Sequence, residues 1–213
     1  MKKIALTIGM AFFAALLMVG QPAEAQTRKQ SKDAKKEAKK LENEGFKTMS
    51  LPIVRQLEQF YVKMDQTDKD GQPFYLMASQ IGVGNSYAAA KMTATNNCKI
   101  DLAKEIRSSV MSEAKNHLAN DMRNAEEASS ITESLERSTM LVAEKLNKVI
   151  VAQEYYKVLD NKNFEVHVVL LYSTNSIREA LLDEAREQLR KSLNNFKPEY
   201  DRILESIINS GVK

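Results

Sequence analysis

Apolar residues recur every three or four positions through most of the chain, but one region follows a two-residue period. The three-to-four spacing is typical of amphipathic helices, and it predicts helices over residues 52–64, 86–120, 130–146 and from Asn175 onwards. Residues 148–172 are instead β-branched and aromatic, which favours two strands, Lys148–Leu159 and Phe164–Tyr172. The turn Asp160–Asn163 joins them into a hairpin. A third strand is expected over Tyr75–Val83, an apolar run that follows a turn. The pattern therefore predicts an α+β fold, a small antiparallel sheet of three strands packed against several long helices.

Local signals define the ends of these helices. Pro52 suits a first helical turn, and Ser86 suits a helix cap. Ser130 and Glu133 have the spacing of a capping box, so we expect a helix to begin at Ser130. An alternative reading breaks the preceding helix into a strand over Ile106–Met111, because that segment carries serines and β-branched residues.

The C-terminal region carries an apolar stripe on each side of Pro198. The first stripe can dock on the sheet, and it consists of Ile177, Leu181, Ala185, Leu189, Leu193 and Phe196. The second consists of Tyr200, Ile203, Leu204, Ile207 and Ile208. Because a proline can start a new helix, we expect the last segment to fold back against the N-terminal helices. The alternative is a segment that projects and needs a partner.

The first 25 residues have the layout of a secretory signal. Lys2 and Lys3 precede the mostly apolar run Ile4–Val19, and Ala23-Glu24-Ala25 is a small-residue cleavage site. This arrangement predicts export to the periplasm or outer membrane of a Gram-negative bacterium. We expect three parts: the signal peptide 1–25, a charged leader helix 26–48 and one domain over 49–213. The single cysteine, Cys98, allows no intramolecular disulfide and lies too far from the signal to be a lipid-anchored cysteine.

Thr27–Lys47 is strongly basic, with eight lysines and arginines against four acidic residues. It has almost no apolar face, so we expect a solvated helix that ends at Gly45. An alternative role for this basic tract is peripheral contact with anionic lipid or peptidoglycan. The whole chain carries a net charge of only +3, too weak to indicate nucleic acid as a partner. We expect no transmembrane span, and the expected partner is another envelope protein or a second copy.

Gly82 and Gly84 stand between the first predicted strand and an alanine-rich helix, which is also the layout of a nucleotide-binding loop. The dinucleotide fingerprint needs a third glycine where this chain has Tyr87, and no P-loop lysine follows. We therefore expect the two glycines to relieve crowding between the strand and the helix, and glycine also permits a positive φ angle there.

No set of residues has the spacing of a catalytic or metal site. His117 and His167 are isolated. His117 is expected to be solvated and His167 to lie at the surface or the hairpin rim, and Cys98 lies on an apolar helical stripe as a buried, inert thiol. Asp65, Asp68 and Asp70 lack the closing glutamate of a calcium loop. The carboxylate pairs Glu126-Glu127 and Asp183-Glu184 are expected on solvated helix faces. We accordingly predict no enzyme activity, no cofactor, and no catalytic, cofactor-binding or metal-binding residues.

The segment Asp70–Ala94, "DGQPFYLMASQIGVGNSYAAAKMTA", resembles uncharacterised exported proteins of Bacteroidota and, more distantly, the Lpp-twenty-type envelope lipoproteins. The resemblance spans roughly Leu57 to Tyr172. The matching positions are Gly82, Gly84, Ala88, Ala89, Ala90, Lys91, Tyr155, Tyr156, Glu165 and Val166. It implies an α+β envelope protein without assigned catalytic residues, although this chain lacks the lipidated cysteine. We predict an exported, non-enzymatic structural or interaction module; the alternative is a periplasmic carrier of a small or lipidic ligand between sheet and helices.

Overall fold

The computed structural model describes residues 23–69, 71–121, 125–145, 149–193 and 196–212. The predicted signal segment before Ala23, together with Asp70, Leu146 and Lys148, lies outside the described residues. The described part forms an α+β fold of three strands and six helices, as the sequence predicts. None of these helices combines the length and apolar character that crossing a bilayer requires.

The sheet contains β1 (Tyr75–Gly84), β2 (Val149–Val158) and β3 (Phe164–Ser173), all antiparallel. The predicted hairpin is confirmed, with strand ends within one residue of the expected ones. β3 is the central strand in the order β1-β3-β2, which explains its continuous apolar run from Val168 to Leu171. β1 and β2 are the two edges of the sheet.

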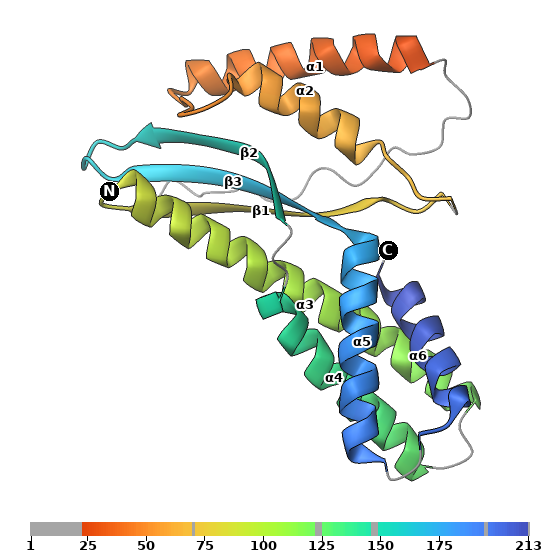
Figure 1. Ribbon diagram of the computed structural model, residues 1–213. Helices are drawn as coiled ribbons and strands as arrows, with labels where there is room; N and C mark the ends of the chain where they lie inside the picture. Colours follow the sequence, from red (N-terminus) through yellow and green to blue (C-terminus); the bar gives the residue numbers. More distant parts are fainter. Residues whose placement is uncertain (1–22, 70, 122–124, 146–148, 194–195, 213) are drawn as a thin grey trace, which may run out of the picture.

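Helices cover both faces of the sheet (Figure 1). α1 (Ala23–Asn43) packs on α2 (Ile53–Met64), and α2 in turn packs on β2. α3 (Tyr87–Asp121) runs along β1 and β3 on the opposite face and then continues past the sheet. Beyond the sheet it packs with α4 (Ala125–Lys145) and α6 (Pro198–Gly211), and α5 (Thr174–Ser192) completes this helical layer.

The buried stripe of α3 winds around the helix and lets it serve both layers. Its buried residues are Ala90, Ala94, Cys98, Leu102, Ile106, Val110 and Ala114, one every four positions. Each step of four residues overshoots a turn of 3.6 residues by about 40°, so the buried face rotates by roughly 240° along the stripe. The face that meets the sheet at Ala90 therefore differs from the face that meets α6 at Val110. Because Ile106 and Val110 belong to this stripe, the alternative strand over Ile106–Met111 is wrong.

Three glycines let backbones approach α3 closely. A Cβ on Gly82 would lie 2.1 Å from the carbonyl oxygen of Ala90, and one on Gly84 would lie 2.7 Å from Ala90 N. A Cβ on Gly211 of α6 would lie 2.8 Å from Cα of Val110. The crowding expected at Gly82 and Gly84 is confirmed. The expected positive φ is not found at either, since the described glycines with positive φ are Gly45 and Gly71.

The C-terminal segment folds back at Pro198, but onto α3 and α5 rather than the N-terminal helices. Arg186 of α5 joins the two helices, with its Nε 2.7 Å from Asp201 Oδ1 and its Nη2 2.9 Å from Glu205 Oε1. Arg178 Nη2 donates to the Val212 carbonyl oxygen at 2.8 Å. α5 docks mainly on α4 instead of the sheet, because β3 passes directly into α5, whose axis leaves the end of the sheet.

Two expectations about helices are wrong. α4 begins at Ala125, and the Ser130 hydroxyl donates back to the Glu126 carbonyl oxygen at 3.0 Å instead of capping a helix. The residues before Ser130 are good helix formers and extend the helix towards the N-terminus. α1 is also not wholly solvated, since Ala34 and Ala38 are buried against α2 in a small core with Leu57. Alanine gives a narrow apolar stripe that lets the two helices approach closely.

Candidate functional site

The outer edge of β2 is closed by two residues from other parts of the chain. The backbone N–H of Glu154 donates to Gln56 Oε1 at 2.6 Å, and Gln56 Nε2 donates to the Glu154 carbonyl oxygen at 3.2 Å. Lys47 and Tyr156 exchange backbone hydrogen bonds of 2.7 and 2.8 Å. The register of β2 also slips at Ala152, between Val151 and Gln153. These features leave no continuous row of free backbone groups between Glu154 and Tyr156.

Replacing Gln56 by Ala is expected to destabilise the protein by about 2–4 kcal/mol, because it leaves both backbone groups of Glu154 without their buried partner. Gln56 is only 5% exposed, and its Nε2 also donates to the Leu51 carbonyl oxygen at 2.7 Å. Urea unfolding followed by circular dichroism measures the change. Gln59→Ala on the exposed side of α2 is the matched control. Equal stabilities for both variants would contradict the proposed role of Gln56.

The outer edge of β1 has no such closure among the described residues. The Thr174 N–H donates to the Phe74 carbonyl oxygen at 3.0 Å, so Phe74 directs its backbone towards β3. Antiparallel pairing alternates, so the even-numbered residues of β1 bond to β3 and its odd-numbered residues direct N–H and C=O outward. Five residues, Tyr75, Met77, Ser79, Ile81 and Val83, therefore present backbone groups at this edge.

The same residues place apolar side chains on the sheet face that α2 leaves open. Met77, Ile81 and Val83 are 42%, 49% and 49% exposed, while Ala78 on the other face is buried against α3. We call Met77, Ser79, Ile81 and Val83 the β1 strip. α2 packs on β2, at the opposite edge of the sheet, so it does not cover the strip. An apolar side-chain row beside free backbone groups is the usual arrangement of a strand that accepts another strand.

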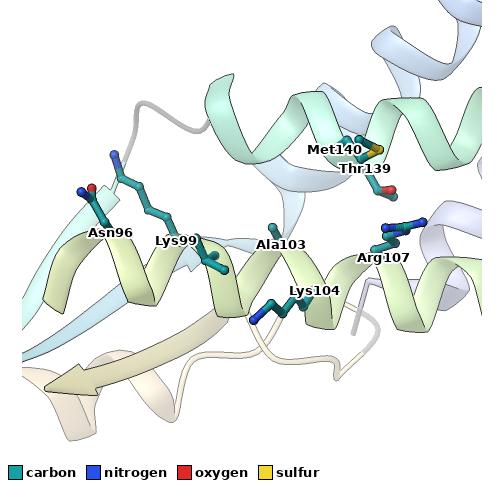
Figure 2. A pocket seen from close by; sticks show the side chains of 8 residues that line it. Asn96, Lys99, Ala103, Lys104, Arg107, Thr139 and Met140 are labelled. Carbon is teal, nitrogen blue, oxygen red and sulfur yellow. The ribbon is translucent and has the colours of Figure 1, made fainter. Parts of the chain in front are cut away.

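A second surface feature is a groove between α3 and α4 of about 550 Å³ (Figure 2). Met140 and Thr139 of α4 face Ala103 and Arg107 of α3, with Lys99 at the end nearer β2. Ile100 and Met140 are 50% and 58% exposed, so the groove is open to solvent. The Arg107 guanidinium forms a salt bridge with the Glu136 carboxylate. The groove offers an apolar floor with a basic rim, but its walls are the outer surfaces of two helices.

The three residues considered for chemistry lie apart. Cys98 is fully buried with its Sγ 3.5 Å from the Val168 carbonyl oxygen, and burial raises the thiol pKa to about 11. The expected burial of Cys98 is therefore confirmed. His167 is part-buried: its side chain is 22% exposed, and its ring lies 4.6 Å from that of Phe46 and 5.2 Å from that of Tyr155. Burial lowers the pKa of His167, which favours its neutral form. His117 is also half-buried, with Nε2 3.4 Å from the Ser206 hydroxyl, because α6 folds over it.

The acidic candidates mostly make structural contacts. Asp68 accepts from the Gln72 N–H at 2.9 Å and lies 3.4 Å from Arg178 Nη1, which ties this loop to α5. Glu127 pairs with Lys197 at 2.9 Å. Its hydrogen bonds to Lys197 and Tyr200 hold the pKa of Glu127 below its usual value. Glu184 departs from the expected solvated face, since it is 5% exposed and accepts from Gln188 at 2.8 Å. Within the described residues, no cluster of three or more metal-ligating side chains forms.

No family model, curated protein or solved structure gives a significant match to the chain. The resemblance to exported Bacteroidota proteins and Lpp-twenty-type lipoproteins therefore stays a prediction. The β1 strip is the candidate functional site that the geometry of the described residues supports best.

Proposed function

We propose that this protein is an exported, non-enzymatic component of the bacterial cell envelope that acts as an interaction module through the β1 strip. The proposal places it in the periplasm or at the outer membrane of a Gram-negative bacterium, as the N-terminal sequence predicts. The basic tract Thr27–Lys47 would lie in α1 and the turn after it, on the β2 side of the molecule. It offers a peripheral contact with anionic envelope components.

The observation that carries the proposal is the contrast between the two sheet edges. An uncovered apolar strand edge favours aggregation, and proteins normally protect such edges with charges, bulges or covering segments. The edge of β2 is protected by a register irregularity at Ala152, by the side-chain amide of Gln56 and by the backbone of Lys47. β1 has no charged side chain over its ten residues, and its apolar strip is open. An edge left in this state is best explained by a partner that covers it.

A photo-reactive residue at position 81 tests this function in the living bacterium. We expect Ile81→benzoylphenylalanine to give a defined covalent adduct, identified by mass spectrometry, when the full chain is expressed in its own host. The same replacement of Val151 is the matched control, because Val151 is similarly exposed, at 50%, but lies on β2, the other edge strand. Absence of an adduct from position 81, or equal adducts from both positions, would contradict the proposed function.

The groove between α3 and α4 favours a second candidate function, the carriage of a small or lipidic ligand. Its volume of about 550 Å³ lies within the range of ligand sites, and Ile100, Met140 and Lys99 would suit an apolar molecule with an anionic end. It lies between two helices rather than between sheet and helices, where the sequence-based alternative expects it. A small molecule that co-purifies and is visible by native mass spectrometry would favour this function over the first.

A further inference from the structure

We infer that the partner of the β1 strip is the β1 strip of a second copy of this chain. The two strands would pair antiparallel about a two-fold axis and would join two three-stranded sheets into one sheet of order β2-β3-β1-β1-β3-β2. This inference rests on the proposed function and deepens it by naming the occupant of the site.

The backbone of β1 fits a copy of itself. The five outward-directed residues are odd-numbered and run from Tyr75 to Val83, so they are symmetric about Ser79. In a two-fold antiparallel pair centred on Ser79, Met77 lies opposite Ile81 of the other copy, and Tyr75 lies opposite Val83. Every such pair would exchange two hydrogen bonds, about ten bonds in all. A register centred on an odd-numbered residue also keeps the open faces of both strands on the same side of the joined sheet.

The side chains fit equally well in this register. Met77 and Ile81 form two apolar cross-strand pairs, Tyr75 and Val83 form two more, and Ser79 meets Ser79. Such cross-strand pairs are the contacts that stabilise a sheet. A partly exposed apolar row thus becomes a continuous apolar row across the new strand pair.

Charge favours a second copy in particular. No residue from Tyr75 to Gly84 is charged, so two identical strands approach without the like-charge repulsion that usually prevents self-pairing. β2, by comparison, carries Glu154 and Lys157. On the open face, α2 leaves the β1 strip uncovered because it packs on β2, the strand farthest from the proposed axis, while α3 packs on the other face of the sheet.

Sedimentation velocity of the purified protein tests the dimer. We expect wild type to sediment as a concentration-dependent dimer, and Ile81→Lys to weaken dimerisation by about a hundredfold by placing a charge opposite Met77 in both symmetry-related pairs. Val151→Lys, on β2 at the opposite edge of the sheet, should dimerise as wild type does. Circular dichroism checks that both variants are folded, which is expected because Ile81 and Val151 are about equally exposed. A wild-type monomer, or a dimer insensitive to Ile81→Lys, would overturn the inference.

Disulfide trapping tests the register. Paired Cα atoms of a hydrogen-bonded antiparallel pair lie about 5.5 Å apart, within the range that a disulfide bridges. Ser79→Cys should form a covalent dimer on mild oxidation, whereas Val158→Cys, on the far strand, should give about tenfold less. Cys98 is buried and contributes no background. No excess of trapped dimer at position 79 would overturn the register.

The same replacements separate this inference from the proposed function. If the adduct from position 81 in the host contains a different protein and wild type sediments as a monomer, the interaction function stands and self-pairing is excluded. If position 81 gives no adduct and wild type is a monomer, both fail. An adduct that contains only this chain supports both.

Discussion

Ending the chain at Lys197, so that α6 is missing, is expected to abolish stable folding. α6 buries Tyr200, Leu204, Ile207 and Ile208, which are at most 3% exposed. Burial of each such side chain contributes roughly 1.5–3 kcal/mol. The four together approach the total stability of a typical domain, about 5–15 kcal/mol. The truncation also removes Asp201 and Glu205, the partners of Arg186.

Circular dichroism and thermal unfolding measure this loss. Ile207→Ala is a milder variant and is expected to cost about 2–5 kcal/mol by leaving a cavity in the core, where Ile207 is fully buried. Glu199→Ala, which changes an exposed residue in the first turn of α6, should leave stability nearly unchanged. An unchanged stability of the truncated chain, with only a change of oligomeric state, would mean that α6 serves assembly rather than the core.

Replacing Gly82 by Ala is expected to destabilise the protein by about 3 kcal/mol or more, the upper range of overpacking effects. The new Cβ would lie 2.1 Å from the Ala90 carbonyl oxygen and 2.5 Å from Ala94 N. Both are backbone atoms of α3, so no side-chain rotation relieves the contact, and the helix must move away from β1. That movement would also loosen the contact of Ala90 and Ala94 with the sheet.

Urea unfolding compares this variant with Gln59→Ala, a change to the same residue type at an exposed position of α2, outside the β1 strip. The control should differ from wild type by about 0.5 kcal/mol or less, as surface substitutions usually do. A Gly82→Ala protein as stable as the control would show that α3 does not rest directly on the backbone of β1.

The strands and their hairpin are predictable because their signals are local. The β-branched alternation from Lys148 to Tyr172 and the turn at Asp160–Asn163 need no information from elsewhere in the chain. Pro198 likewise predicts a new helix by its own backbone restriction. The surface on which that helix rests depends on tertiary packing, and there the expectation fails: α6 lies on α3 and α5.

The packing of α1 escapes a sequence reading because its contact is made mostly by alanines. Ala34 and Ala38 add little to any measure of apolar character, yet both are buried. Local signals can also compete, as at the start of α4. Ser130 and Glu133 match a capping box, but the helix-forming residues from Ala125 onwards extend the helix past it.

The candidate site was not predictable as a surface. The run Tyr75–Val83 is apolar enough to read as a fully covered strand, and only the strand order reveals that it lies at an edge. Which face stays open follows from the position of α2 over β2, which is fixed by the bonds of Gln56 to Glu154, 98 residues away. A sequence reading could have noted that the run has no charge and only one proline near it, Pro73, just before its start.

The winding stripe of α3 has a consequence for cooperativity. The sheet layer and the helical layer have no separate cores joined by a linker, because one continuous helix supplies side chains to both. Melting of the first half of α3 exposes the underside of β1 and β3, and melting of its second half exposes α6. Fraying of α3 in either layer therefore shortens the same helix and weakens the other layer. This favours unfolding of the sheet layer and the helical layer as one unit.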